Sequence, residues 1–262
     1  MKILFTICGR AGSKGFKNKN LKEINHIPLL YYTLAVILGY IKSNPHHQVL
    51  VALNTDSDSL KELIQKQNKL SVLCVERRER LAGDIVPKVE VIQDTYLQMI
   101  EFAPDVVVDL DITSPCRRVA DLENIIQVYS AGKYDIVFSV VQARRNPYFN
   151  MVEKKEDGFY RKICKSSYTA RQQAPQSYEL NASIYAYKPA FLNGLIDRTI
   201  LDYSCGISIM PDYLVLDIDS EEDFEMMQYL HHFYCEKDIG LKEIYKIANT
   251  INQERLKESV KP

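Results

Sequence analysis

The fold of this chain is decided by the stretch KILFTICGRAGSKGFKNKNLK, residues 2–22. Its first part, residues 2–8, is mostly apolar, is rich in residues that favour β-structure, and meets glycine at once. That pattern predicts a buried first strand. Residues 9–22 are polar, basic and glycine-containing, so we expect a loop at the carboxyl end of this strand.

The loop has the composition of a polyphosphate site. Gly9, Gly12 and Gly15 recur at every third residue, which lets the backbone turn tightly and point its N–H groups inward, as in an anion-binding nest. Arginine can hold a phosphate through two hydrogen bonds, and lysine acts as a point charge. The cations of the loop are Arg10, Lys14, Lys17 and Lys19.

Two familiar phosphate-binding loops do not fit these residues. The P-loop needs lysine and then serine or threonine after its last glycine, but Gly15 is followed by Phe16. The dinucleotide fingerprint needs G-x-G-x-x-G running directly into a helix. Here the spacing is G-x-x-G-x-x-G, and the next helical pattern waits for Pro28. The loop is therefore predicted to hold polyphosphate in another way.

Beyond the loop, strand and helix patterns alternate. We expect strands at residues 49–53, 71–75, 105–110, 134–141, 184–187 and 213–218, and helices at 29–40, 59–68, 87–101, 120–131 and 221–233. Such alternation predicts a single α/β domain over residues 1–262, with a three-layer, Rossmann-like, mostly parallel sheet and helices on both faces. Ligands in such sheets bind beyond the carboxyl ends of the strands. The polar segments expected to meet there are residues 9–20, 54–58 and 111–118.

Two segments depart from the alternation. Residues 142–178 are polar, with arginines and lysines among aromatic side chains, and we interpret them as an inserted arm. Residues 238–262 are charged and have a helical pattern, which predicts a C-terminal helical tail.

The composition excludes several functions. The 33 basic and 34 acidic residues give a net charge of −1, so the chain has no global positive field for nucleic acid. The 6 cysteines form no C-x-x-C pair, which argues against a zinc site and for free thiols in a reducing compartment. The apolar run at residues 3–8 is too short for a signal peptide or a membrane span. We therefore expect a soluble cytoplasmic protein without a membrane partner.

The loop resembles the signature loop of the acylneuraminate (CMP-sialic acid, or nonulosonic acid) cytidylyltransferases, which reads roughly R-G-G-S-K-G-x-x-x-K-N. The residues that match it position by position are Arg10, Gly12, Ser13, Lys14, Gly15, Lys19 and Asn20.

Later segments resemble further motifs of that family in the same order, over about residues 2–232. They are Asn54-Thr55-Asp56 (S-T-D in the family), Arg77 with Leu81-Ala82-Gly83-Asp84 (R-P-x-x-L-A-G-D), Thr113-Ser114-Pro115 with Arg117 (P-T-S-P-L-R), Asn146-Pro147-Tyr148 (H-P-Y), Arg171-Gln172 with Asn181 and Ile184-Tyr185 (R-Q…N-G-A-I-Y), and Asp217-Ile218-Asp219 (D-I-D). Each motif alone has moderate specificity, and their ordered set is more specific.

The resemblance implies a nucleotide-diphospho-sugar transferase fold and a reaction. In that family the anomeric hydroxyl of a nine-carbon 2-keto sugar acid attacks the α-phosphorus of CTP in line, which gives the CMP-sugar and pyrophosphate. The resemblance also implies Mg²⁺ or Mn²⁺ as cofactor, and a homodimer in which the arm at residues 142–178 crosses to the second subunit.

The matched motifs imply roles for individual residues. Those implied as catalytic are Arg10, Lys14, Lys19 and Asp217, and those implied as nucleotide-binding are Arg10, Gly12, Ser13, Lys14, Lys19, Asn20, Thr55, Arg77, Asp111 and Thr113. Those implied for the acceptor sugar are Arg171, Gln172, Asn181 and Tyr185. Asp217 and Asp219 are the implied metal ligands, because residues two apart at a strand end share one face.

The chain departs from the family pattern around the base and the sugar. Asp111 stands where the family has glutamine, and Ile85 stands near a position where it often has a small hydroxyl residue. An ionised aspartate only accepts hydrogen bonds, although an acceptor can still take the exocyclic amine of cytosine. We therefore hypothesise a branch that uses a sialic-acid-like bacterial sugar, such as legionaminic or pseudaminic acid, rather than sialic acid itself.

Two other interpretations stay open. A Kdo cytidylyltransferase shares the expected fold, but its loop usually reads S-x-R-x-P-x-K, which Ser13-Lys14-Gly15-Phe16 does not fit. A non-catalytic nucleotide-binding protein of the same fold would be expected to lack the loop cations or the aspartate pair. Arg10, Lys14, Asp217 and Asp219 are all present.

Overall fold

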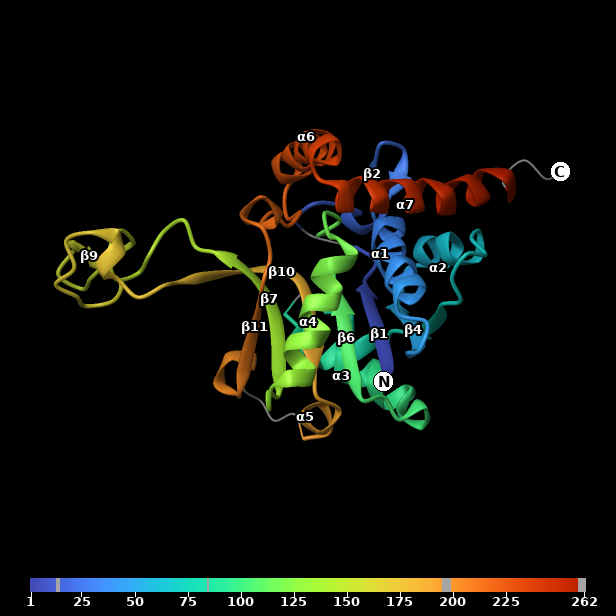
Figure 1. The fold of residues 1–262 in the computed structure, drawn as a ribbon, viewed down its shortest axis with the longest axis horizontal. Helices are drawn as coiled ribbons and strands as arrows, with labels where there is room; N and C mark the ends of the chain where they lie inside the picture. The colour runs from blue at the N-terminus through green and yellow to red at the C-terminus, as the bar shows by residue number, and fades with distance from the viewer. Residues whose placement is uncertain (13–14, 84, 195–198, 259–262) are drawn as a thin grey trace.

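The computed structural model describes residues 1–12, 15–83, 85–194 and 199–258. Its centre is a seven-stranded sheet with the order β11-β7-β10-β6-β1-β4-β5 (Figure 1). β10 runs antiparallel to β6 and β7, and the other neighbouring pairs are parallel. The strands are β1 (Lys2–Gly9), β4 (Gln48–Thr55), β5 (Leu73–Glu76), β6 (Val106–Leu110), β7 (Ile136–Gln142), β10 (Tyr178–Tyr187) and β11 (Cys205–Ile209).

Helices cover both faces of this sheet, so the predicted three-layer, mostly parallel α/β fold is confirmed. The helices whose side chains join the core of one face are α1 (Leu29–Ser43), α2 (Asp58–Gln65), α4 (Val119–Ala131), α6 (Glu221–Lys237) and α7 (Ile239–Glu258). The other face is covered by α3 (Lys88–Gln98) and α5 (Pro189–Asn193).

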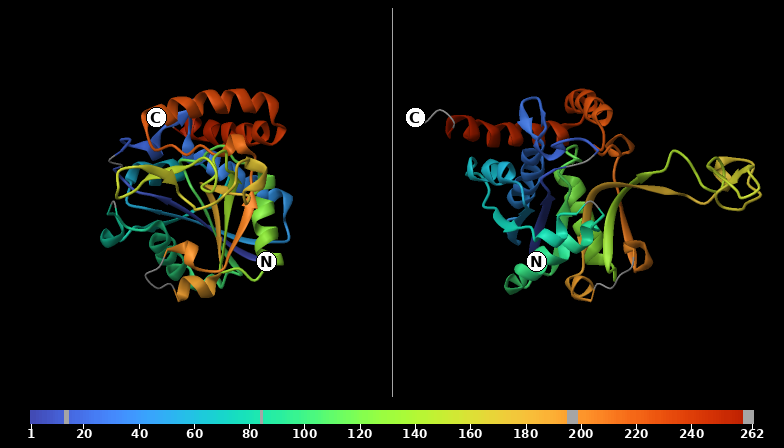
Figure 2. Two further views of the ribbon diagram at one scale, coloured as in Figure 1. Left: turned by 90° about the vertical axis from the view of Figure 1, so that its left-hand side faces the viewer. Right: turned by 180° about the vertical axis from the view of Figure 1, so that it is seen from behind.

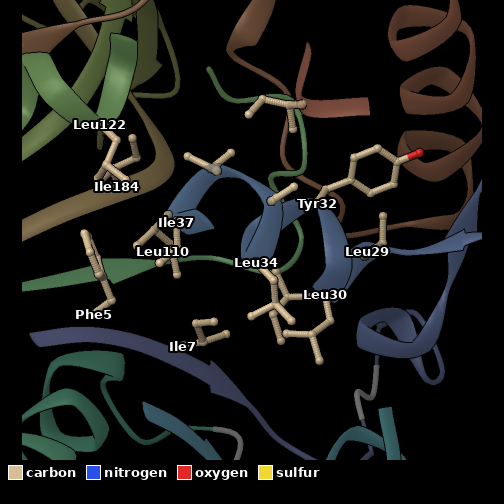
Figure 3. Close-up of a cluster of buried hydrophobic side chains, with 14 of the residues drawn as sticks. Phe5, Ile7, Leu29, Leu30, Tyr32, Leu34, Ile37, Leu110, Leu122 and Ile184 are labelled. Atoms are coloured by element: carbon tan, nitrogen blue, oxygen red, sulfur yellow. The ribbon is translucent and has the colours of Figure 1, made fainter. Parts of the chain in front are cut away.

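The first strand shows why the sheet is buried on both sides. Alternate side chains of a strand point to opposite faces, and in β1 Phe5 and Ile7 join the core under α1, whereas Leu4 joins the core under α3. Helix α1 lies between the sheet and α7, which explains why nearly all its length is buried. Figure 3 shows the packing of α1 side chains such as Leu34 and Ile37 against β1 and β6.

One strand of the sheet was not predicted, and one predicted strand is absent. Residues 205–209 form the edge strand β11, which pairs in parallel with β7, whereas the sequence here has cysteine and glycine and no long β-forming run. Residues 213–218 do not form the predicted strand. A 3₁₀ turn at Asp212–Leu214 follows Pro211, and the next residues run past the loop after β6, where the Ile218 N–H donates to the Thr113 carbonyl at 3.1 Å.

Residues 23–28, which follow the predicted loop, form a small hairpin. Strands β2 (Glu23–Ile24) and β3 (Ile27–Pro28) pair antiparallel. Asn25 and His26 form the connection, with positive φ angles of 52° and 61°, as a two-residue hairpin turn requires.

The inserted segment extends away from the sheet. Strands β8 (Val152–Lys154) and β9 (Tyr160–Lys162) form a hairpin at its tip, well clear of the rest of the chain in Figures 1 and 2. Phe159 and Tyr160 at this tip are each 68% exposed. Among the helices in the described ranges, none combines the length and the apolar character that a membrane span requires.

A buried histidine links α6 to the core. His231 is 2% exposed, its ring lies 4.9 Å from that of Tyr32, and the amide of Asn25 lies 3.2 Å from its Nδ1. Burial lowers the pKa of His231 to about 4, from an ordinary value of 6.5. The folded protein therefore holds this side chain neutral.

We expect this histidine to make stability pH-dependent. Because the pKa of His231 is depressed in the folded protein, the fold has its full stability above pH 6.5 and loses stability as pH falls towards 4. The unfolded chain takes up the proton first. Urea unfolding at several pH values measures the free energy of unfolding. Between pH 7 and pH 4 this free energy should fall by about 2 kcal/mol more in wild type than in His231→Gln. The exposed His46→Gln serves as control, and parallel curves for wild type and His231→Gln would contradict the assignment.

Candidate active site

A polar cleft lies at the carboxyl ends of β1 and β6, where the sequence predicted the site. Its cavity volume is about 180 Å³. It brings together many of the predicted site residues, namely Arg10, Lys19, Asn20, Arg77, Asp111, Thr113 and Asp217. Thus segments from the two ends of the chain and from its middle meet in one place.

The phosphate loop is held from both sides. The Ala11 N–H donates to Asp56 Oδ1 at 2.7 Å, and Asn20 Nδ2 donates to the Arg10 carbonyl at 3.3 Å. Gly12 has a φ of 67°, a conformation that glycine adopts without steric cost. The predicted Ser13 and Lys14 lie outside the described residues. These contacts hold the backbone at Arg10, which lines the cleft.

The predicted phosphate cation Lys19 contacts the predicted metal ligand Asp219. Lys19 Nζ lies 2.8 Å from Asp219 Oδ1 and donates to the Ile218 carbonyl at 3.1 Å. The strand assumed for the aspartate pair is absent, but Ile218 is fully buried between Asp217 and Asp219. Both carboxylates therefore remain beside the cleft, the first in its lining and the second on Lys19.

Asp217 has an unusual protonation equilibrium. Burial, and next the charge of Asp111, raise its pKa to about 6, although Thr113 and Lys19 oppose the shift. The described residues contain no group of three or more histidine, cysteine or acidic side chains arranged around a metal. A cation held by Asp217 and Asp219 would take its other ligands from phosphate and water, as Mg²⁺ commonly does.

An ion-paired lysine in the cleft was missed by sequence reasoning. Lys88, in the first turn of α3, places its Nζ 2.7 Å from Asp109 Oδ2 and 2.6 Å from Asp111 Oδ2. Asp109 is fully buried and also accepts from the Thr6 hydroxyl at 2.8 Å. One signal was available, because an aspartate inside the apolar run at residues 106–110 needs a cation partner.

Asp111 is ionised and already has protein donors. Burial opposes its charge, but Lys88 outweighs burial, and the pKa of Asp111 falls to about 2. Its Oδ2 accepts from Lys88, and its Oδ1 accepts from the Thr113 hydroxyl at 3.0 Å. The sequence prediction that Asp111 borders the nucleotide did not anticipate this pairing.

Arg117 fixes the backbone of the same loop. Its guanidinium is fully buried and donates to the carbonyls of Asp111 at 2.6 Å and Ser183 at 2.8 Å. It also donates to the Thr33 hydroxyl at 2.6 Å. Burial lowers the pKa of Arg117 to about 10, so the side chain stays charged at neutral pH and joins β6, β10 and α1.

The remaining predicted residues lie in four other places. The Thr55 hydroxyl accepts from the Ser57 N–H at 3.0 Å, and Asn181 is buried with its amide bonded to Ser139 and Leu214, so neither lines the cleft. Tyr185 lines a separate cavity of about 420 Å³. Arg171 and Gln172 line a hollow of about 480 Å³ at the base of the arm.

Comparison with known proteins gives consistent matches. Residues 4–250 match a family described as cytidylyltransferase. The flagellin modification protein B of Campylobacter coli is 34% identical over 87% of this chain and 94% of its own. The CMP-N,N'-diacetyllegionaminic acid synthase of Campylobacter jejuni is 33% identical over the same shares. A solved CMP:2-keto-3-deoxy-manno-octonic acid synthetase complexed with CTP shares the fold, with a TM-score of 0.66 at 14% identity, over 89% of this chain and 100% of that one.

We expect Asp56 to support the phosphate loop. Asp56→Ala removes the acceptor of the Ala11 N–H, and the loss of one charge-assisted bond should weaken the binding of a nucleoside triphosphate about tenfold. Isothermal titration calorimetry measures this directly. Asp58→Ala is the matched control, since that carboxylate begins α2 with its side chain 99% exposed. Equal losses in both variants would contradict a special role for Asp56.

Proposed function

The chain belongs to the cytidylyltransferase family, and we propose that it joins CTP to a nine-carbon 2-keto sugar acid of the sialic-acid type. The products are the CMP-sugar and pyrophosphate. The observation that carries this proposal is the cleft that Arg10, Lys19 and Arg77 line together with Asp217. Cations beside a carboxylate pair suit a triphosphate with a divalent ion.

The reaction depends mainly on the positioning of the two substrates and on stabilisation of the negative charge that develops on the phosphates. The anomeric hydroxyl oxygen forms a bond to the α-phosphorus, the bond from that phosphorus to the β-phosphate oxygen breaks, and the hydroxyl proton passes to solvent or a nearby base. Arg10 and Lys19 would bind the phosphates and stabilise the charge that moves to pyrophosphate. The bonds that hold the loop from Asp56 and Asn20 keep Arg10 in place for this.

We propose Asp217 and Asp219 as ligands of Mg²⁺ or Mn²⁺. Two hard carboxylates fit such an ion when phosphate oxygens and water complete its shell. A bound divalent ion would add positive charge at the phosphate oxygens. Lys19 would then exchange its contact with Asp219 for one with a phosphate, which its flexible four-carbon chain permits.

For the acceptor we propose an acylated, deoxygenated sugar acid of the legionaminate or pseudaminate type, with N-acetylneuraminate as the second candidate. Two observations support this order. One relative is named a CMP-N,N'-diacetyllegionaminic acid synthase. In this chain Lys88 pairs with Asp111, which stands at the position where the motif of the sialic acid family has glutamine.

We also propose that residues 142–178 make a homodimer. The hollow lined by Arg171 and Gln172 and the cavity at Tyr185 have no described lining residue in common. On this proposal the two side chains would therefore meet a sugar acid in a partner's site. The exposed Phe159 and Tyr160 at the arm tip offer apolar area for such an interface.

Pyrophosphate release tests the proposed function. Purified protein with CTP, Mg²⁺ and each sugar acid should turn over the legionaminate type fastest. Asp217→Asn should lower kcat by on the order of 100-fold or more, because it removes a charge beside the reacting phosphates. The control is Glu62→Gln, an exposed carboxylate on α2 paired with Lys66. Turnover of Kdo alone, or release that Asp217→Asn leaves unchanged, would contradict the proposal.

A further inference from the structure

We propose that Lys88 determines acceptor specificity by donating a hydrogen bond to an oxygen of the sugar acid. The inference rests on the proposed function and names the residue that reads the acceptor. It begins from the position of Lys88 between two spaces, the polar cleft and the cavity at Tyr185.

Lys88 and Asp111 form the border between these spaces. Among the described residues, only these two line both the polar cleft and the cavity of about 420 Å³. An acceptor must reach from the α-phosphate in the cleft into a space large enough for a sugar. In this chain that path passes the ion pair.

The cavity beyond the pair is largely apolar. Its described lining contains no charged side chain besides Lys88 and Asp111, and its other members are Pro87, Val89, Ala182, Tyr185, Tyr187, Thr199 and Ile200. The rings of Tyr185 and Tyr187 stack there, with centroids 6.3 Å apart. This surface suits the acyl and deoxy parts of a sugar acid better than hydroxyls, which lose their water on entry. The polar atoms of such a ligand would then meet the ion pair.

The ammonium of Lys88 has a donor to spare for that contact. It carries three N–H groups. Asp111 Oδ2 accepts one of them at 2.6 Å, and Asp109 Oδ2 lies 2.7 Å from Nζ as an ion pair. Its side chain is still 33% exposed, so the two carboxylates do not seal it. Because both carboxylates fix its position before a ligand arrives, little conformational entropy is lost on binding.

The alternative is that Lys88 only neutralises the buried Asp109, and the test must separate the two roles. Lys88→Met alone leaves Asp109 buried without a cation and is expected to harm the fold. The double variant Lys88→Met/Asp109→Asn removes the ammonium and the fully buried carboxylate together, and it leaves Asp111 without its partner. Comparison of this double variant with Asp109→Asn alone measures the loss of the ammonium, and the Kd for CTP reports any displacement of Asp111 that follows.

The experiment measures two constants for each variant: the KM for the sugar acid at saturating CTP, and the Kd for CTP by calorimetry without sugar. We expect the double variant to have a sugar acid KM about tenfold above that of Asp109→Asn, with the Kd for CTP within about twofold. Lys61→Met, which breaks an exposed pair with Glu76, should change neither constant. Urea unfolding checks that every variant is folded.

Three results would overturn the inference. An unchanged KM in the double variant would make Lys88 purely structural. Weakened CTP binding with an unchanged sugar acid KM would assign Lys88 to the nucleotide. Absence of turnover by wild type with every sugar acid would remove the proposed function, and this inference with it, so the two failures are distinguishable.

Discussion

The site depends on one ammonium group that compensates two carboxylates at the edge of the sheet. A buried carboxylate without a cation costs several kcal/mol, and Asp109 is fully buried near the carboxyl end of β6. Burial works against the charge of Lys88, but Asp109 and Asp111 outweigh it and hold the pKa of Lys88 well above its usual value. The pair therefore ties the first turn of α3 to β6 and sets the position of one wall of the cleft.

The parallel strands determine where the other walls of the cleft lie. Because β1, β4 and β6 run in the same direction, the segments after them reach one edge of the sheet. Arg117 fixes the segment after β6 through backbone carbonyls, and Asp56 binds the segment after β1. Charged groups at the edge are thus held by buried or backbone contacts, and Arg10 and Lys19 both line the cleft that these contacts shape.

The sequence predicted best the strands and helices that local residue patterns determine. The apolar run of β1, the helix α1 after Pro28 and the helix α2 come from local patterns, and the structure has them. Strand β11 gave no such signal, because five residues at a sheet edge gain their stability from pairing with β7. The mostly apolar residues 213–218 pack against the core without strand pairing, which periodicity alone cannot distinguish from a strand. The ion pairs of Lys88 and of Lys19 join residues far apart in sequence, so only the fold reveals them.

The most direct test of this account is a crystal structure of the protein with CTP and Mg²⁺. We predict the triphosphate within hydrogen-bonding distance of Arg10 and Lys19, and the metal between the phosphates and the carboxylates of Asp217 and Asp219. A nucleotide bound elsewhere, for example in the hollow at the base of the arm lined by Arg144 and Arg171, would contradict the account.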